Sequence, residues 1–309
     1  MRNFRRHILL LPFILLAASG CIRIEEEDKG SAQELITVSF KAVMEDNQTK
    51  TALDGGLGDA YRSLKWLPTD EIAVSTDYQW SEHYKFSSID SEPTESGNFS
   101  GEIPESGTYY AVYPYSAVNS WNDYGRNLQV YIPNKQIYAE NTFATDMNPM
   151  VARGARGEVL QFKNLCGLLA INLKSQNNDV VKSVSLAASD ANGNLTAIAG
   201  NYDVRMDFDY ESGPVLTNST TQASMILMDC GDGVQLNGDT SVPFHFVLAP
   251  GDYSKIAVIV TTTDGKTMIR EGKNPLTIKR AEWAMKLTFL YGRGCHCPSS
   301  VRNGCRQEH

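Results

Sequence analysis

The stretch at 36–45, ITVSFKAVME, decides the fold that we predict for this chain. Its apolar residues of one parity are Ile36, Val38, Phe40, Ala42 and Met44. The other parity is polar except at Val43, and a period of two over ten residues predicts a β-strand with one buried face. Burying the four large side chains of this face is worth about 6–12 kcal/mol. That is comparable with the net stability of a whole domain, about 5–15 kcal/mol. A domain without this strand would therefore expose an apolar groove.

The rest of the chain also favours β-structure. Short runs rich in β-branched and aromatic residues, separated by turn residues, lie at 71–76, 84–87, 98–103, 108–113 and 128–132. A second block begins at 159–173 and continues through 180–186, 195–199, 203–207, 221–228, 242–248, 255–263, 268–271 and 283–291. Asp264-Gly265 between two of these runs predicts a hairpin. The pattern predicts an all-β protein built from two sandwiches.

Between these blocks, at 134–158, the strand pattern lapses, which indicates a crossing between domains. We therefore predict one sandwich at 36–155 and another at 156–291. A chain of 309 residues is long enough for two such domains.

The N-terminus is typical of an exported protein. Arg2, Arg5 and Arg6 precede the apolar run 8–18, which is too short to span a bilayer. Ser19 and Gly20 before Cys21 resemble the bacterial lipobox, so residues 1–20 are expected to be a signal peptide cleaved between Gly20 and Cys21. Cys21 would then carry the lipid anchor, palmitate included. An ordinary signal peptide with an incidental cysteine is the alternative.

An acidic segment follows. Residues 21–35 contain the run Glu25-Glu26-Glu27-Asp28, which predicts an extended tether by charge repulsion. The run also resembles export signals that bring lipoproteins to the outer face of the outer membrane. The formal charge of −8 becomes −11 when the three arginines at 2, 5 and 6 are removed. This balance argues against a nucleic-acid partner, which needs a basic patch.

No motif in the sequence indicates catalysis, a metal or a cofactor, so we do not expect an enzyme. The histidines stand outside recognisable catalytic contexts, and His245 alternates with Phe244 and Phe246 as expected for the wet face of a strand. Residues 190–194, DANGN, resemble half of a calcium loop, but they lack the distal glutamate and favour a β-turn.

The cysteines divide into two groups. Cys166 and Cys230 lie in apolar strand contexts and are expected in the core. The tail at 292–309 lacks the strand pattern and contains Cys295, His296, Cys297, Cys305 and His309. These side chains could ligate zinc, but structural zinc sites usually have two or more residues between paired cysteines. A disulfide or a disordered tail is therefore favoured over a zinc site.

Several short motifs follow one another in a characteristic order over residues 36 to 291. They are Phe40-Lys41-Ala42 with Glu45, Thr49-Lys50-Thr51, Trp66 with Asp70-Glu71-Ile72, Phe99-Ser100-Gly101, Tyr109-Tyr110-Ala111-Val112-Tyr113-Pro114, Pro133 with Gln136, Met150-Val151-Ala152, Phe162-Lys163-Asn164-Leu165-Cys166-Gly167-Leu168-Leu169 and Ala199-Gly200. In this order they resemble the fimbrillin-like family, the lipoprotein-precursor pilins of type V pili.

The resemblance implies two transthyretin-like Greek-key β-sandwich domains in tandem and a lipid-anchored precursor on the outer membrane. It also implies that an arginine-specific protease cuts after the first strand, here after Arg62. The strand that carries Ile36, Val38, Phe40, Ala42 and Met44 would leave, and a strand of another pilus subunit would replace it. The partners would be other pilus subunits and surface ligands of a host or of bacteria.

Two further interpretations of function remain open. Only 18 residues follow Tyr291, without an apolar alternation, so a tip, accessory or anchor subunit fits as well as a stalk subunit. The alternative function is a monomeric surface lipoprotein that binds glycan or host protein through the exposed aromatic residues Trp80, Tyr84, Trp121 and Tyr124.

Overall fold

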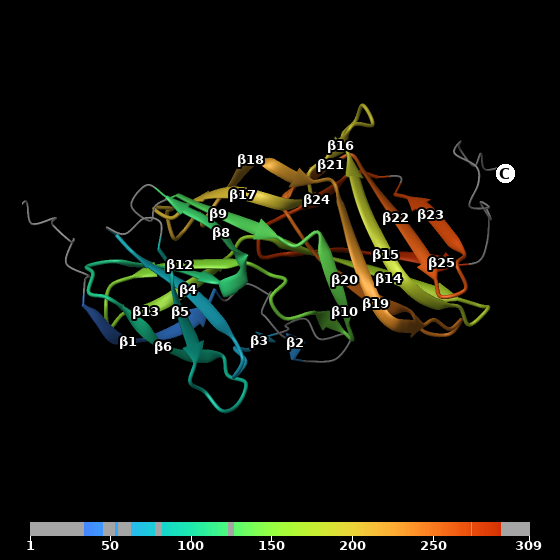
Figure 1. The fold of residues 1–309 in the computed structure, drawn as a ribbon. Helices are drawn as coiled ribbons and strands as arrows, with labels where there is room; N and C mark the ends of the chain where they lie inside the picture. Colours follow the sequence, from blue (N-terminus) through green and yellow to red (C-terminus); the bar gives the residue numbers. More distant parts are fainter. Residues whose placement is uncertain are drawn as a thin grey trace, which may run out of the picture. The chain divides into compact units, whose positions relative to one another are not determined.

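The computed structural model describes residues 34–45, 53–54, 63–77, 82–122, 127–272 and 274–291, and their regular structure is almost entirely β-strand (Figure 1). Side chains at 53–54, 63, 122, 218–220 and 283–291 are outside this description. The short 3₁₀ helix η1 spans Tyr115–Ala117. No helix in these ranges has the length and apolar character needed to cross a bilayer. The predicted all-β class is confirmed.

Seven strands hydrogen-bond in a closed ring, which we call the barrel. In order around the ring they are β1 (Leu35–Met44), β13 (Val159–Asn164), β12 (Met150–Gly154), β7 (Tyr109–Tyr113), β4 (Glu71–Thr76), β5 (Tyr84–Ser88) and β6 (Ser96–Pro104). Only the pairing of β1 with β13 is parallel in this ring; the other six pairings are antiparallel.

The remaining strands form further sheets. The largest has the order β11 (Thr142–Phe143), β10 (Lys135–Ala139), β19 (Met225–Gln235), β15 (Val180–Ser189), β22 (Lys255–Thr262) and β23 (Thr267–Glu271), with β16 (Leu195–Thr196) beside β15. A three-stranded sheet has the order β20 (Val242–Leu248), β14 (Gly167–Ser175) and β25 (Trp283–Tyr291). A four-stranded sheet has the order β18 (Leu216–Ala223), β17 (Ala199–Arg205), β9 (Asn127–Ile132) and β8 (Val118–Asn122). Two small pairs are β2 (Leu53–Asp54) with β3 (Ser63–Leu64), and β21 (Gly251–Tyr253) with β24 (Leu276–Ile278).

Most of the predicted strands coincide with observed ones. The predictions at 71–76, 242–248 and 283–291 match β4, β20 and β25 residue for residue. The prediction at 159–173 was too long, because a break at Leu165 and Cys166 separates β13 from β14. The hairpin at Asp264-Gly265 joins β22 to β23 as expected.

The prediction that the strand pattern lapses at 134–158 is wrong, because this segment contains β10, β11 and β12. Met150, Val151 and Ala152 of β12 are all buried, so the first three residues of this strand do not alternate between an apolar and a polar face.

Strand pairing crosses the expected boundary at 155–156 in both directions. The strand β13, which follows the boundary, belongs to the barrel, while β9 and β10, which precede it, pair with β17 and β19. The described residues, which begin at Glu34, form one compact unit. The tandem arrangement of two Greek-key sandwiches and its boundaries stay a prediction.

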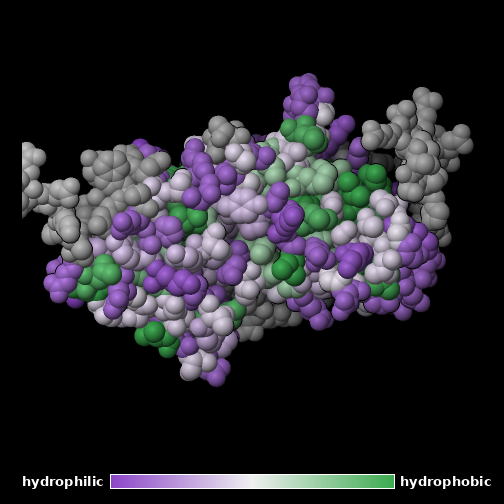
Figure 2. All heavy atoms as spheres, in the orientation of Figure 1, coloured by the Kyte–Doolittle hydropathy of each residue, from purple (hydrophilic) through white to green (hydrophobic). Residues whose placement is uncertain are grey.

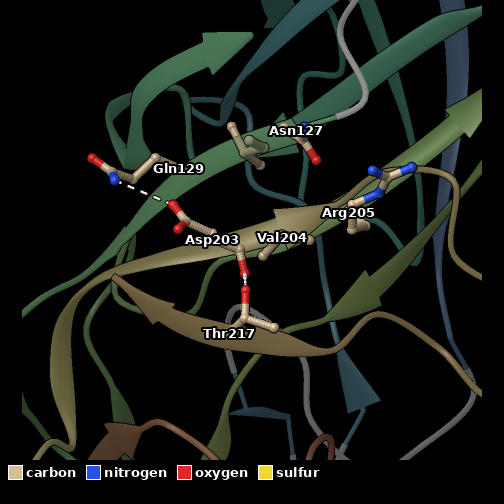
Figure 3. A pocket seen from close by; sticks show the side chains of 7 residues that line it. Asn127, Gln129, Asp203, Val204, Arg205 and Thr217 are labelled. Carbon is tan, nitrogen blue, oxygen red and sulfur yellow. Dashed lines mark hydrogen bonds between the residues drawn. The ribbon is translucent and has the colours of Figure 1, made fainter. Parts of the chain in front are cut away.

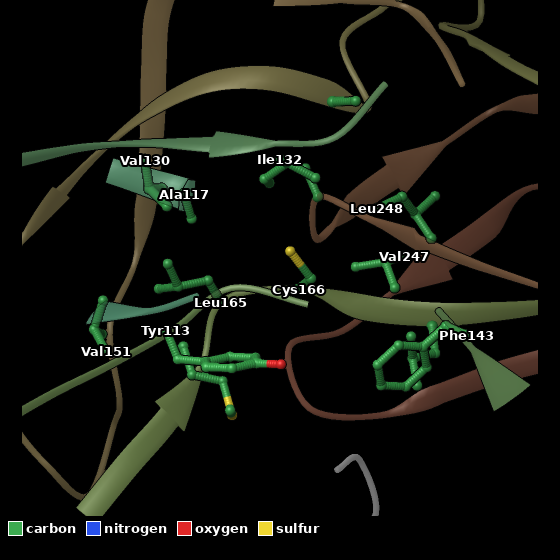
Figure 4. Packing of buried hydrophobic residues seen from close by; sticks show 14 of the residues in the cluster. Tyr113, Ala117, Val130, Ile132, Phe143, Val151, Leu165, Cys166, Val247 and Leu248 are labelled. Atoms are coloured by element: carbon green, nitrogen blue, oxygen red, sulfur yellow. The ribbon is translucent and has the colours of Figure 1, made fainter. Parts of the chain in front are cut away.

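The core is continuous through the junction between β13 and β14. Leu165 and Cys166 lie there among buried side chains of β7, β9, β12 and β20 (Figure 4). The barrel therefore shares its apolar interior with the strands that follow it.

Candidate functional site

The strand β1 occupies a place between β6 and β13, which we call the β1 seat. Nine residue pairs join β1 to β6, from Leu35 opposite Pro104 to Val43 opposite Ser96. Four further pairs join it to β13, from Lys41 opposite Val159 to Met44 opposite Phe162. Figure 1 shows β1 in blue beside these two strands. The strand thus completes the ring of hydrogen bonds.

The inner face of β1 is the one that the sequence predicted. Val38, Phe40, Ala42 and Met44 are buried, while Thr37, Ser39 and Lys41 are exposed. Ile36 is only half-buried, near the start of the strand. Burying the three large side chains at 38, 40 and 44 contributes about 5–9 kcal/mol.

Aromatic rings line the β1 seat. The ring of Phe40 lies 5.5 Å from that of Phe86 and 5.2 Å from that of Tyr109, measured between centroids. The indole nitrogen Nε1 of Trp66 donates a hydrogen bond to the carbonyl oxygen of Ala42, at 3.1 Å. Trp66 is fully buried, and its ring makes edge-on contacts with Phe99 and Phe162.

Two glycines of β6 make room for these rings. Gly97 stands opposite Ala42, and a Cβ atom on Gly97 would lie 2.7 Å from Cγ of Trp66. Gly101 stands opposite Val38, and a Cβ there would lie 2.7 Å from a ring carbon of Phe86. The close approach of rings to the backbone therefore requires glycine at both positions.

A buried carboxylate closes the end of β1. The Glu45 side chain is 4% exposed and forms ion pairs with Arg280, at Oε1, and with Lys163, at 3.4 Å from Nζ to Oε2. The backbone N–H of Asn164 donates to Oε1 at 2.8 Å, and the N–H of Glu45 donates to the carbonyl oxygen of Phe162 at 2.9 Å. We call Arg280, Lys163 and the Asn164 N–H the cationic rim.

The backbone holds Arg280 in place. Its neighbour Ala281 donates its N–H to the carbonyl oxygen of Cys166 at 2.9 Å. The guanidinium packs against Gly213, where a Cβ atom would lie 2.5 Å from it and where φ is +76°. Glu45 and Arg280 are 235 residues apart in the sequence, so sequence patterns could not join them.

Several predicted site residues lie outside the described residues. These are Gly20 and Cys21 at the expected signal cleavage, Arg62 at the expected processing site, and Cys295, His296, Cys297, Cys305 and His309 of the tail. Their roles stay predictions. Among the described residues, no group of three or more metal-ligating side chains lies together.

The expected aromatic binding surface is corrected at one position. Trp121 is 4% exposed and lies in the core, so it is not an exposed loop aromatic. Its strand β8 pairs with β9, whose Leu128 opposite it is also buried. Tyr84 is half-buried and donates its hydroxyl to Glu82. Trp80 and Tyr124 are outside the described residues.

His245 is a second correction. It is 3% exposed rather than on a wet face, and it stands opposite Ala170 of β14. It belongs to a run of six consecutive buried residues of β20, 243–248, because both faces of this strand are covered. Alternation between Phe244 and Phe246 therefore did not mark a polar face.

Two other predictions are confirmed. Cys166 and Cys230 are buried, and burial raises the pKa of the Cys230 thiol to about 12. The segment at 190–194 is a turn in which the Asp190 carboxylate accepts hydrogen bonds from the N–H groups of Asn192 and Asn194.

A buried acid–phenol pair lies in the barrel. The Tyr113 hydroxyl donates to Oδ1 of Asp70 at 3.1 Å, and the N–H of Leu67 donates to Oδ2 at 2.7 Å. Burial raises the pKa of Asp70 to about 6. No sequence pattern indicates this pair, since its members are 43 residues apart.

A polar hollow of about 300 Å³ lies on β9, β17 and β18 (Figure 3). The Gln129 amide donates to Asp203 at 3.2 Å, and the Thr217 hydroxyl donates to the Asp203 carbonyl oxygen at 3.1 Å. Arg205 on the same wall pairs with Asp207. These polar groups satisfy one another, so the hollow has no arrangement that indicates a specific ligand.

The surface elsewhere carries separate apolar side chains. Leu227 of β19 stands opposite Ser185 of β15, and Ile259 of β22 stands opposite Ile269 of β23; Leu227 and Ile269 are exposed. Figure 2 shows apolar groups among hydrophilic ones over the region of β15, β19 and β22. Nothing in the structure shows what would cover them.

No protein-family model matches the sequence, and no curated protein matches it. The chain is similar to solved structures of adhesion and fimbrial proteins. One is a candidate cell adhesion protein from Bacteroides ovatus, with 12% identity over 86% of this chain and 95% of that one, at a TM-score of 0.49. Another is a fimbrial assembly protein from Parabacteroides distasonis, with 9% identity over 84% and 92%, at 0.39. A third is the tip fimbrial protein Mfa3 from Porphyromonas gingivalis, with 10% identity over 77% and 81%, at 0.29. These scores and identities are too low to assign a function by themselves.

Proposed function

We propose that this chain is a structural subunit of a cell-surface pilus, exported as a lipoprotein through Cys21 and assembled by exchange of β1. A cut after Arg62 would release the segment that contains β1. A strand of a neighbouring subunit would then fill the β1 seat. The observation that carries the proposal is the position of β1 between β6 and β13, where it completes both the barrel and its core.

The free energy lost on removal of β1 supports the proposal that another strand fills the β1 seat. Removal of β1 would expose the aromatic lining at Phe86, Tyr109 and Trp66, and the lost burial of about 5–9 kcal/mol is of the order of the net stability of a domain. The edges of β6 and β13 would also lose their backbone hydrogen-bond partners. Unpaired edges with an apolar floor favour addition of an extended segment.

The place of Arg62 in the sequence also supports the proposal. Arg62 directly precedes β3, which starts at Ser63 and pairs with β2. A cut there would separate β2 from β3 and leave Leu64, which is fully buried, with the body. β1 has no strand before it among the described residues, so one cut frees it from the rest of the chain.

In this proposal the precursor is anchored on the outer membrane by its lipid, and the mature form lies in the fimbrium. Its partners are other pilus subunits, and the subunit occupies a tip or accessory position. Its work is assembly and adhesion rather than catalysis. The monomeric glycan-binding alternative loses its leading residue, since Trp121 lies in the core.

A disulfide that locks β1 in the seat tests the proposal. Ser39 of β1 stands opposite Ser100 of β6, and their hydroxyl oxygens are 3.2 Å apart on the outer face, so cysteines there can approach as a disulfide requires. The doubly substituted Ser39→Cys/Ser100→Cys chain should reach the surface, be cut, and retain its first strand. It should fail to join polymers until a reductant is added.

The single variants Ser39→Cys and Ser100→Cys are matched controls and should assemble normally. Mass spectrometry of the assembled material should find Ser63 as the mature N-terminus. Polymers formed by the oxidised double variant, or assembled subunits that keep the lipidated Cys21, would contradict the proposal.

A further inference from the structure

We infer that the β1 seat selects a donor strand that carries a side-chain carboxylate directly after its last buried apolar residue. The inference rests on the proposed function and adds to it the chemistry of the partner. The selecting element is the cationic rim of Arg280, Lys163 and the Asn164 N–H.

The cationic rim stays with the body when β1 leaves. Glu45 lies on the N-terminal side of Arg62 and departs with β1, whereas Lys163 belongs to β13 and Arg280 lies between β24 and β25. Among the described residues both cations form their ion pairs with Glu45. Release of β1 therefore leaves two neighbouring positive charges without the carboxylate between them.

Burial makes that charge pattern selective. With a strand in the seat the side chains of Arg280 and Lys163 are only 20% and 17% exposed, so in a refilled seat water replaces a missing carboxylate poorly. A donor with an amide or an apolar residue at this place would leave both cations without a carboxylate partner, with Arg280 keeping its hydrogen bond to the carbonyl oxygen of Asn164, and a basic residue would add repulsion. Unpaired buried charges discriminate strongly against such partners.

The register fixes where the carboxylate has to be. Met44 stands opposite Phe162, and the N–H of Glu45 donates to the carbonyl oxygen of Phe162. An incoming strand with the direction of β1 would be held by the same acceptor. Its acidic residue then follows the fourth of four alternate inward positions, equivalent to 38, 40, 42 and 44.

The seat also limits the third inward position to a small side chain. Ala42 is fully buried opposite Gly97, with Trp66 packed over both. The partner therefore carries apolar, apolar, small, and apolar residues at alternate positions, followed at once by Asp or Glu. This pattern describes the donor segment of another subunit rather than any apolar extended peptide.

Peptide exchange into the cut protein tests the inference. The full chain would carry a site for a sequence-specific protease in place of residues 55–60, and the cut complex would keep its first strand noncovalently until a labelled peptide displaces it. The two peptides span residues 34–48, one with Glu45 and one with Glu45→Gln, and both carry Asp46→Asn so that no neighbouring acid substitutes. Fluorescence anisotropy would report the affinity of each.

We expect the Glu45 peptide to bind at least roughly 30-fold more tightly than the Glu45→Gln peptide at low salt. In a cut complex with Arg280→Met and Lys163→Met this ratio should approach one. Equal affinities for the unsubstituted complex would overturn the inference and leave strand exchange intact. If neither peptide entered the seat, the proposed exchange itself would fail.

Discussion

The strands β1 and β14 differ in how they are buried, and the difference bears on which of them the proposed exchange could release. In β1 only one face is buried, and Thr37, Ser39 and Lys41 face solvent. In β14 every residue but Lys174 is buried, between β20 and β25. A released β1 segment would still present a polar face to water, whereas a released β14 would not. Of the two strands, the amphipathic β1 is therefore the one that fits the proposed exchange.

The largest expected effect tests this difference directly. Phe40→Ala should lower the free energy of unfolding of the uncut chain by about 3–5 kcal/mol, because the ring packs against Phe86 and Tyr109. After removal of β1, a body derived from this variant should be identical to that from the unsubstituted chain. Leu169→Ala in β14 should cost about 2–5 kcal/mol before the cut and remain costly after it.

Denaturant unfolding of the uncut and cut forms measures both changes. Lys41→Ala, on the exposed face of β1, is the matched control and should stay within about 0.5 kcal/mol of the parent. An effect of Phe40→Ala no larger than that of the control would show that β1 does not complete the core.

A second, smaller effect is a dependence of the unfolding free energy on pH, which arises from Asp70 in the barrel. Burial raises the pKa of Asp70 from 3.8 to about 6, so the folded state holds a proton that the unfolded state releases. The contribution of protonated Asp70 to the unfolding free energy is fully present below pH about 4. It is lost as pH rises through about 6, which is a change of about 2–3 kcal/mol.

Asp70→Asn should remove this dependence. From pH 4 to pH 7, the unfolding free energy of the parent should fall by about 2–3 kcal/mol relative to that of the variant. Denaturant unfolding at a series of pH values measures it, with Asp90→Asn, on the surface of the barrel, as the control. A constant difference across this range would mean that Asp70 titrates normally.

The smallest effect concerns the glycines opposite β1. Gly97→Ala should destabilise the uncut chain by about 1–3 kcal/mol, because its Cβ would meet the Trp66 ring. The control is Gly107→Ala, because a Cβ atom there would lie 3.8 Å from its nearest neighbour. Gly193→Ala would not be neutral, since φ at Gly193 is +85°. Equal melting temperatures for the two variants would contradict the close packing of Trp66 on β6.

Amphipathic strands were the predictable part of this fold. The burial of Val38, Phe40, Ala42 and Met44 follows from their period of two. The same reasoning failed for β12 and for His245 in β20, because strands covered on both faces have no polar side to alternate with. Trp121 was misplaced for a different reason, since Asn119 and Ser120 before it in β8 are exposed and Trp121 is a buried side chain next to polar ones.

The seat itself was only half predictable. The strand that fills it, β1, has a local pattern, but the rim joins Glu45 to Arg280 across 235 residues. Only the folded chain brings such distant charges together. The sequence showed Glu45 as one acid among many, with no sign that its carboxylate would be buried.

The parallel pairing of β1 with β13 has a consequence for the order of events during biogenesis. Residues 41–44 find their partner only when 159–162 have been delivered, so the ring cannot close until more than half of the chain is present. Contacts this distant in sequence form slowly. The leading segment can pair with β6 earlier, but its other edge stays open until β13 arrives, so the folding chain passes through a form in which the ring is not yet closed.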